Sequence, residues 1–226
     1  MRFDAIIFDF DGVLLESEFQ GSQLLAEVLT GLGHPTTVGE AIEHFTGLAG
    51  PDFVTTVETR IGRPLPPDFH EQTRAASARA LREGIAAVTG AVEFVRALPA
   101  ALPKAVASSS STRWIRTHLS HLGLDDIFEP HIYSGREHVE RGKPAPDLYL
   151  HAAERLAVDI KRTVIIEDSK VGATGAWASG ASVIGLAAGK HCFDGHEEML
   201  RAVGVTNIAR SFEDVARLVG IDQPRR

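Results

Sequence analysis

The chain has 226 residues, 44% of them hydrophobic and 23% charged, a composition that excludes disordered and low-complexity proteins. Its formal net charge is −7 and it has no basic run, so we expect neither nucleic acid nor a membrane as a partner. We expect the protein to be a monomer or a weak homodimer. Asp4 and Asp9 interrupt the short apolar run near the N-terminus, which is not typical of a signal peptide, and no run reaches the roughly 18 apolar residues of a membrane span. Cys192 is the single cysteine, so no internal disulfide can form. These features favour a cytoplasmic protein.

Short apolar runs predict five β-strands, at residues 4–9, 104–108, 131–134, 163–167 and 182–186. Near-continuous apolar runs are typical of strands that are covered on both faces. Helical patterns lie between and after them: residues 112–122 follow the N-cap candidate Ser111, residues 147–156 carry an apolar stripe, and residues 211–214 resemble a capping box. Strands that alternate with helices predict an α/β fold with a doubly wound, Rossmann-like parallel sheet.

About seventy residues between the first and second predicted strands have no strand pattern. Capping-box patterns at 17–20, 37–40 and 68–71 predict helix starts there, and a further apolar stripe ends at Gly62. A structureless loop of this length is rare inside a compact domain. We therefore predict a helical cap domain at residues 17–88, inserted into an α/β core domain of residues 1–16 and 89–226, with hinges near residues 14–17 and 86–90.

Polar residues follow the predicted strands where an open parallel sheet binds its ligands, beyond the carboxyl ends of the strands. They are Asp9, Asp11, Ser108, Ser109, Lys143, Glu167 and Asp168. Clustered carboxylates repel one another, and a hard divalent cation with oxygen ligands, such as Mg²⁺, removes that repulsion. A lysine and hydroxyl groups beside such an ion would bind phosphate. The set therefore predicts Mg²⁺-dependent phosphoryl transfer with a carboxylate nucleophile.

At these residues the sequence resembles the haloacid dehalogenase-like phosphohydrolase superfamily. Its four ordered motifs are matched by Asp9-Phe10-Asp11-Gly12-Val13, Ser108, Lys143 and Glu167-Asp168-Ser169. The helical insert is similar to the cap of the β-phosphoglucomutase-like subgroup, which includes sugar-phosphate phosphatases. The resemblance implies a haloacid dehalogenase-like fold, with Asp9 as the nucleophile that forms an aspartyl-phosphate and Asp11 as the general acid and base.

The resemblance also implies the groups that bind phosphate and metal. Ser108, the Ser109 backbone and Lys143 would hold the transferring phosphoryl group. Asp9, the Asp11 carbonyl and Asp168 would bind Mg²⁺, and Glu167 would support the ion directly or through water.

Two departures favour a phosphatase over a hexose-phosphate mutase. Gly21 stands where the mutase pattern has a histidine in the first cap helix, and the loop at residues 45–51 has no arginine to grip a second phosphate. The mutase stays open as an alternative, and a phospho-accepting signalling receiver module is a third reading. Glu18 either binds a substrate hydroxyl or is a favourable charge in a helix's first turn, and His44, Thr46 and Gly47 either face the substrate or lie on the surface.

Several other residues have a structural and a functional reading. Trp114 and Trp177 lie in helical patterns and are predicted to be core residues. The glycines at 172, 175 and 180 are expected to permit close helix packing. His191, Cys192 and His196 either bind a soft metal or lie close by chance in a chain with 10 histidines.

Overall fold

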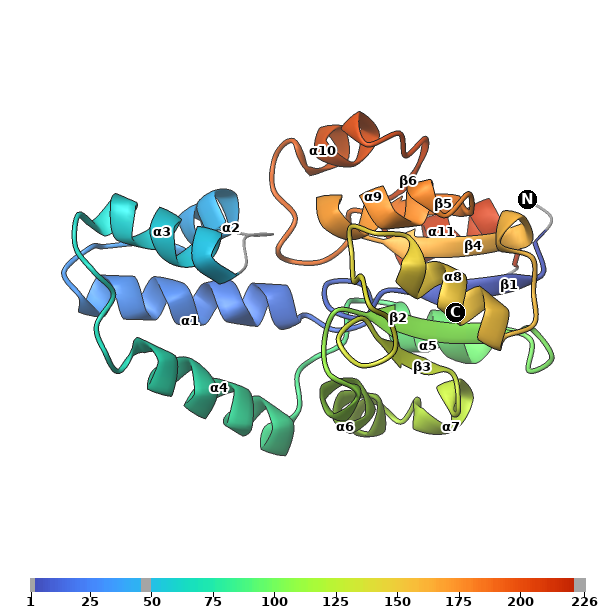
Figure 1. The fold of residues 1–226 in the computed structure, drawn as a ribbon, viewed down its shortest axis with the longest axis horizontal. Helices are drawn as coiled ribbons and strands as arrows, with labels where there is room; N and C mark the ends of the chain where they lie inside the picture. Colours follow the sequence, from blue (N-terminus) through green and yellow to red (C-terminus); the bar gives the residue numbers. More distant parts are fainter. Residues whose placement is uncertain (1–2, 46–49, 222–226) are drawn as a thin grey trace.

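A computed structural model describes residues 3–45 and 50–221 of the chain, and a six-stranded parallel sheet lies at its centre (Figure 1). The strands are β1 (Ala5–Phe8), β2 (Lys104–Ser108), β3 (Ile132–Ser134), β4 (Thr163–Glu167), β5 (Ser182–Leu186) and β6 (Asn207–Ala209). Their order is β3-β2-β1-β4-β5-β6, so the direction of winding reverses between β1 and β4. The predicted doubly wound sheet is confirmed.

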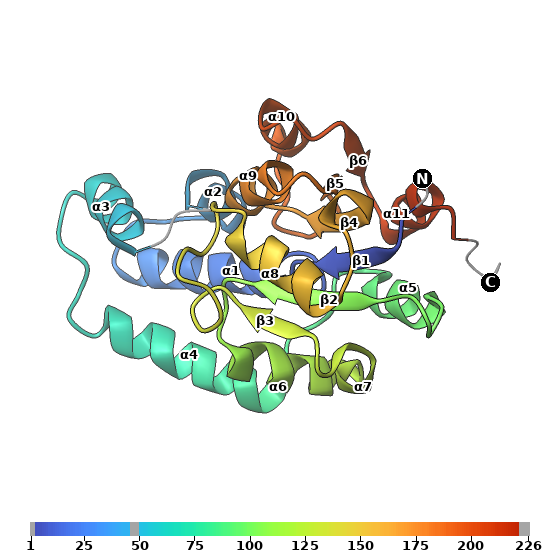
Figure 2. The same ribbon diagram turned by 45° about the vertical axis from the view of Figure 1, so that its right-hand side comes forward.

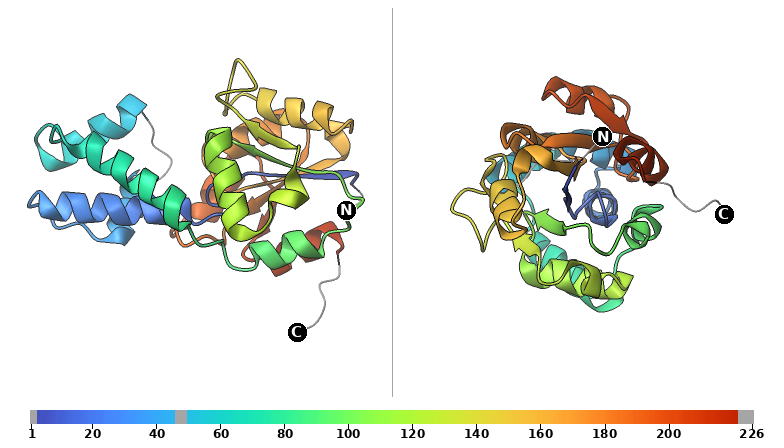
Figure 3. Two further views of the ribbon diagram at one scale, coloured as in Figure 1. Left: turned by 90° about the horizontal axis from the view of Figure 1, so that it is seen from below. Right: turned by 90° about the vertical axis from the view of Figure 1, so that its right-hand side faces the viewer.

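Alternating strand residues build a separate core on each face of the sheet. Ile6 and Phe8 of β1 belong to one cluster, and Ile7 belongs to the other. The first cluster packs under α5 (Ala91–Ala97), α6 (Thr112–Leu122), α7 (Asp125–Phe128) and α11 (Phe212–Val219). The second packs under α8 (Asp147–Arg155), α9 (Lys170–Ala178) and α10 (His196–Ala202), and the short 3₁₀ turn η1 (Ile160–Arg162) leads into β4. Figure 3 shows these two helical layers on either side of the strands.

The segment between β1 and β2 is helical, as predicted, and lies beyond one end of the sheet (Figure 1). It consists of α1 (Ser17–Gly31), α2 (Val38–Phe45), α3 (Gly50–Ile61) and α4 (Phe69–Glu83), and it has an apolar cluster of its own. We call residues 17–88 the helical insert. The C-terminal part of α4 lies beside α6 of the core (Figure 2).

The two chain connections of the helical insert run side by side. The backbone N–H of Glu16 donates to the Ala86 carbonyl at 2.9 Å, and that of Val88 donates to the Leu14 carbonyl at 3.1 Å. Both predicted hinge segments therefore belong to one short paired stretch. The domain boundaries at 16/17 and 88/89 stay a prediction.

The helices begin at or next to the predicted starts, but only some of the predicted capping contacts form. Thr37 and Glu40 form a reciprocal capping box, and Ser111 and Ser211 accept hydrogen bonds from the first turns of α6 and α11. Ser17 does not cap α1, because its hydroxyl donates to a carboxylate of the core instead. Asp68 precedes α4 without a side-chain capping bond.

Other differences concern short or exposed features. Strand β6 has only three residues and begins with a polar side chain, so it lacks the apolar run that marks the other strands. Trp177 is 59% exposed and is not a core residue. Gly180 has a φ of +85° with open space around it, so it turns the chain after α9 and does not serve close packing. None of the described helices is long and apolar enough to cross a lipid bilayer.

Candidate active site

The predicted site residues meet at the carboxyl ends of β1, β2 and β4, beside the point where the strand order reverses. Phe8 of β1 is in register with Ile166 of β4, and the Asp9 backbone N–H donates to the Ile166 carbonyl at 2.9 Å. This pairing places Asp9 next to Glu167 and Asp168. Such a reversal point is where open α/β sheets bind their ligands.

Lys143 joins two of the carboxylates. Its Nζ lies 2.6 Å from Asp9 Oδ1 and 2.6 Å from Glu167 Oε1, and all three side chains are buried. Burial opposes the charge of Lys143, but Asp9 and Glu167 outweigh it and hold the lysine pKa above its ordinary value. Burial, reinforced by Glu167 and Asp168, raises the pKa of Asp9 well above its ordinary value against the opposing charge of Lys143.

Asp11 sits two residues further on in a different environment. Its Oδ1 accepts hydrogen bonds from Ser17 Oγ at 2.7 Å and Trp114 Nε1 at 3.0 Å. Its Oδ2 accepts from Ser108 Oγ at 3.1 Å and Ser110 Oγ at 2.6 Å. The donors come from the start of α1, the end of β2 and the first turn of α6. Asp11 is therefore surrounded by neutral hydrogen-bond donors, whereas Asp9 forms an ion pair with Lys143.

Asp168 completes an oxygen-rich cluster. Asp9, Glu167 and Asp168 each offer a carboxylate oxygen, and these oxygens lie within 4.8 Å of one another. Asp168 Oδ1 is buried and has no hydrogen-bond partner within the described part of the chain. Both oxygens of Glu167 already accept bonds, Oε1 from Lys143 and Tyr149 and Oε2 from Ser169. A buried, unpartnered oxygen among carboxylates fits a hard divalent cation.

Gly12 allows this approach of Asp168 to the first motif. Its φ is +82°, and a Cβ at this position would lie 2.1 Å from Asp168 Oδ2. A side chain would therefore displace the carboxylate as well as strain the backbone.

A cavity of about 340 Å³ opens beside Asp11, between the helical insert and the core. Its lining includes Ser17 and Trp114, both of which bond to Asp11, and the aromatic side chains of Phe45, Phe53 and Phe69. Glu18 is the one charged residue among the described residues that line it. Burial, with smaller contributions from Asp168 and Asp11, raises the pKa of Glu18 to about 7.

Candidate substrate residues of the insert have mixed outcomes. The position of Glu18 in the cavity wall is compatible with contact to a substrate. His44 is exposed and lines a separate depression on α2 and α3. Thr46 and Gly47 lie outside the described residues.

Sequence reasoning missed five side chains of this site: Ser17, Ser110, Trp114, Tyr149 and His191. Trp114 packs against the core cluster as a half-buried residue, and its N–H also donates to Asp11, a role that the sequence did not predict. A signal was present, since Trp114 lies in the first turn of a helix that starts directly after β2. Ser109, a predicted phosphate ligand, is exposed, and it is the next serine that reaches Asp11.

Comparison with known proteins agrees with this geometry. Residues 6–186 match the family model of haloacid dehalogenase-like hydrolases. The chain belongs to this family. This haloacid dehalogenase-like hydrolase is 30% identical over 183 residues to a phosphorylated carbohydrates phosphatase of Thermotoga maritima, with 78% of this chain and 82% of the relative covered. It is 27% identical to 6-phosphogluconate phosphatase of Escherichia coli (strain K12), with 84% and 85% covered.

Solved structures of other haloacid dehalogenase-like proteins share the fold over nearly the full length. One from Agrobacterium tumefaciens strain C58 is 32% identical, with a TM-score of 0.89 over 96% of this chain and 98% of that one. A hydrolase of the family from Deinococcus radiodurans R1 with bound phosphate and sodium is 33% identical, with a TM-score of 0.84 and 99% of each chain covered. The structural neighbours include a β-phosphoglucomutase-like protein from Thermotoga maritima, 25% identical with a TM-score of 0.73, 97% of this chain and 100% of that one being covered.

Proposed function

We propose that this hydrolase is a Mg²⁺-dependent phosphatase that cleaves a small phosphate monoester, a sugar phosphate in the first instance, through an aspartyl-phosphate on Asp9. One observation carries the proposal: Asp9, Glu167 and Asp168 form a buried cluster with Lys143, while Asp11, two residues after Asp9, accepts hydrogen bonds from neutral donors. The names of the relatives, which are phosphatases of phosphorylated sugars and sugar acids, support the substrate class.

The residues present fit the ion. Asp9, Asp168 and the Asp11 carbonyl would bind Mg²⁺, with Glu167 in support directly or through water, and the unpartnered Asp168 Oδ1 is the oxygen most in need of a cation. When bound, the ion would offset the negative charge of the carboxylates and of the incoming phosphate. The relative with bound phosphate and sodium is consistent with an anion and a cation sharing such a site.

The side chains then divide the reaction into two displacements. Asp9 attacks phosphorus, the bond to the leaving oxygen breaks, and a protonated Asp11 gives that oxygen its proton. Asp11, now a base, takes a proton from the water that hydrolyses the aspartyl-phosphate. Lys143, with Ser108 and the Ser109 backbone, holds the phosphoryl oxygens, and the charge of the lysine favours the ionised form of Asp9 against the effect of burial.

We further propose that the helical insert is a cap that shields the phosphoryl group from bulk water and selects the alcohol part of the ester. The cavity favours a monophosphate, because its described lining contains no Lys or Arg that would pair with a second phosphate. Gly21, at the position of the mutase histidine, lies in this wall. Both features favour the phosphatase over the mutase alternative.

A signalling receiver module is the third candidate. It would also hold a phospho-accepting aspartate, a lysine and Mg²⁺, but would not turn over. A receiver module needs neither a second acid such as Asp11 nor a substrate cavity beside it. Both features therefore support an enzyme.

Steady-state assays test the proposal. Wild-type protein with Mg²⁺ should release phosphate continuously from p-nitrophenyl phosphate, and a chelator should stop it. Asp9→Asn should abolish turnover and covalent labelling, whereas Asp11→Asn should slow the hydrolysis of alkyl phosphates about 10²-fold, since their leaving group needs a proton.

The alternatives predict different results. Retained turnover in Asp9→Asn would remove Asp9 from the nucleophile's role. A single burst that leaves a stable phosphoprotein would favour the receiver module. Efficient conversion of β-glucose 1-phosphate to glucose 6-phosphate would favour the mutase.

A further inference from the structure

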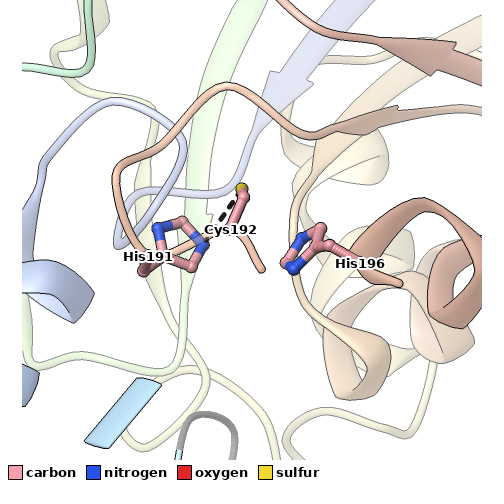
Figure 4. A group of neighbouring side chains, drawn as sticks. All are labelled: His191, Cys192 and His196. Atoms are coloured by element: carbon pink, nitrogen blue, oxygen red, sulfur yellow. Dashed lines mark hydrogen bonds between the residues drawn. The ribbon is translucent and has the colours of Figure 1, made fainter. Parts of the chain in front are cut away.

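Three side chains that the proposed reaction does not use lie together behind Asp168. His191 and Cys192 belong to the loop after β5, and His196 is the first residue of α10. One ligand atom from each lies within 4.8 Å of the other two, and His191 Nε2 is 3.9 Å from Cys192 Sγ. Figure 4 shows the three side chains gathered in one place, with the thiol next to the His191 ring. We call them the His–Cys–His cluster.

The hydrogen bonds of His196 orient it as a metal ligand. Its Nε2 lies 2.8 Å from the backbone carbonyl oxygen of Asp168. A carbonyl only accepts, so Nε2 carries the proton and Nδ1 of the neutral ring keeps its lone pair. That Nδ1 is buried and has no partner in the described residues. Metal-binding histidines characteristically donate their other ring N–H to a carbonyl or carboxylate.

His191 also contacts Asp168, but through Nε2, the same nitrogen that lies near the thiol. Its Nε2 lies 2.7 Å from Asp168 Oδ2, and its Nδ1 is likewise buried without a partner among the residues described. Glycines make room for the ring: a Cβ at Gly189 would lie 2.4 Å from His191 Cε1, and one at Gly12 3.0 Å from it. Each of the two buried imidazoles therefore has one unpartnered nitrogen among the described residues, and both rings lie close to one thiol.

We propose that the His–Cys–His cluster is a second cation site, which takes a borderline or soft divalent ion such as Zn²⁺. Two nitrogens and one sulfur suit such an ion, whereas Mg²⁺ prefers the oxygen cluster of Asp9, Glu167 and Asp168. On binding, the Cys192 S–H bond breaks, the thiolate coordinates the ion and the proton passes to solvent. A water or an oxygen of Asp168 would fill the fourth position.

An ion bound to the His–Cys–His cluster should change the hydrogen bonds of Asp168. Both histidines hydrogen-bond to that residue, and binding of the ion through His191 Nε2 replaces the bond to its carboxylate. Zinc should therefore raise the Mg²⁺ concentration needed for half-maximal phosphatase activity several-fold. This consequence rests on the proposed function, whereas the binding itself does not.

Cobalt is the probe that separates the two sites. Full-length, metal-stripped protein titrated with Co²⁺ should take up one equivalent with a thiolate-to-cobalt charge-transfer band. Asp9→Asn should keep this band, because it alters only the oxygen cluster and the proposed phosphatase activity. Absence of the band in the wild type would overturn the proposal, whatever the outcome of the phosphatase assays.

Ligand variants give the second measurement. Zn²⁺ competition against a chromophoric chelator should show that Cys192→Ser and His196→Gln each weaken the affinity about tenfold or more. His70→Gln, which changes an exposed histidine of α4, should leave it unchanged. Zinc should also slow the reaction of wild-type Cys192 with a thiol reagent, a result that needs no variant to fold. Equal zinc affinity in wild type and His196→Gln, or no protection of Cys192, would contradict the proposal.

Discussion

At the scale of single residues, Asp9 and Asp11 acquire different properties from their neighbours although they are two positions apart. The charge of Lys143 opposes the rise in the Asp9 pKa that burial causes, whereas Asp11 accepts hydrogen bonds from neutral donors. Trp114 Nε1 is a donor and cannot accept, so Oδ1 of Asp11 must face it as an acceptor. Serine hydroxyls can both donate and accept, and those of Ser108 and Ser110 lie at Oδ2. In the proposed reaction, the proton that Asp11 would transfer belongs at Oδ2, the oxygen that bonds to the predicted phosphate ligand Ser108.

Glu18 gives a prediction about pH and stability. Its pKa is raised from 4.5 to about 7 in the folded protein, so between these values the native state binds more protons than the unfolded state. The stabilising contribution is therefore complete below pH 4.5 and is lost as the pH rises through 7. The Gln side chain in Glu18→Gln stays neutral at every pH. The free energy of unfolding of this variant, relative to that of the wild type, should therefore rise by about 1–3 kcal/mol from pH 5 to pH 8.

Urea unfolding in a chelating buffer at several pH values measures this difference. Glu27→Gln, which changes an exposed glutamate of the same helix, is the matched control and should show no such gain with pH. A difference between Glu18→Gln and wild type that stays constant from pH 5 to 8 would show that Glu18 is not protonated in the native state.

The sequence predicts the part of the site that lies at strand ends. Asp9, Ser108 and Glu167 could be placed together because parallel strands bring their carboxyl ends to one edge. Trp114 and His191 could not, because a helix and a long loop carry them there. No periodic pattern records where the side chain of a first helical turn or a loop points.

At the scale of elements, the close fit of α9 against β4 positions the cluster. Gly172 of α9 faces Glu167 so closely that a Cβ there would lie 1.6 Å from Glu167 Oε1. Since this carboxylate also bonds to Lys143 and Tyr149, the packing of one helix sets the position of three site residues. The expectation that Gly172 permits close packing agrees with this contact.

Gly172→Ala should therefore destabilise the protein by about 1–3 kcal/mol, since the added methyl group must displace a buried carboxylate. It should also lower kcat for p-nitrophenyl phosphate, because Lys143 would lose part of its support. Gly21→Ala, in α1, is the matched control: no heavy atom lies within 4 Å of the added Cβ, and alanine should stabilise the helix by about 0.5–1 kcal/mol. Thermal unfolding of both variants checks the opposite signs, and equal shifts would contradict the packing argument.

All three helix starts with a capping-box pattern were predictable, but the capping contact itself forms only where no distant group competes for it. Thr37 and Glu40 satisfy each other within one turn, so four residues of sequence contain the whole interaction. Ser17 has the same pattern, but Asp11 captures its hydroxyl. The tertiary contact outweighs the local one because it is made to a carboxylate.

At the scale of the whole molecule, the cavity forms where the helical insert meets the core at Trp114. Its walls come from all four helices of the insert, α1 to α4, and from Trp114 of the core. These segments are far apart in the sequence, so their shared lining could not be predicted from it. The charge of that lining follows once the fold is known, and Glu18 makes it negative.

Substrate charge is the property that this lining should select. A second phosphate on the substrate would meet Glu18 without a compensating cation, so we expect a hexose monophosphate to be hydrolysed at least about tenfold more efficiently than the corresponding bisphosphate. Thr73→Lys adds a cation to the cavity wall and should reduce this preference about fivefold, the effect of roughly 1 kcal/mol for a partly exposed ion pair.

The matched control is Thr59→Lys, an exposed position on α3 outside that wall. The hydroxyl of each threonine donates to a carbonyl of its own helix, Thr73 to that of His70 and Thr59 to that of Thr55, so the two changes cost similar local contacts. The ratio of kcat/KM for the two esters is the measurement. If Thr59→Lys shifts this ratio as much as Thr73→Lys does, the net charge of the protein and not the cavity determines the preference for the monophosphate. If the wild type shows no preference, the second phosphate does not enter this cavity.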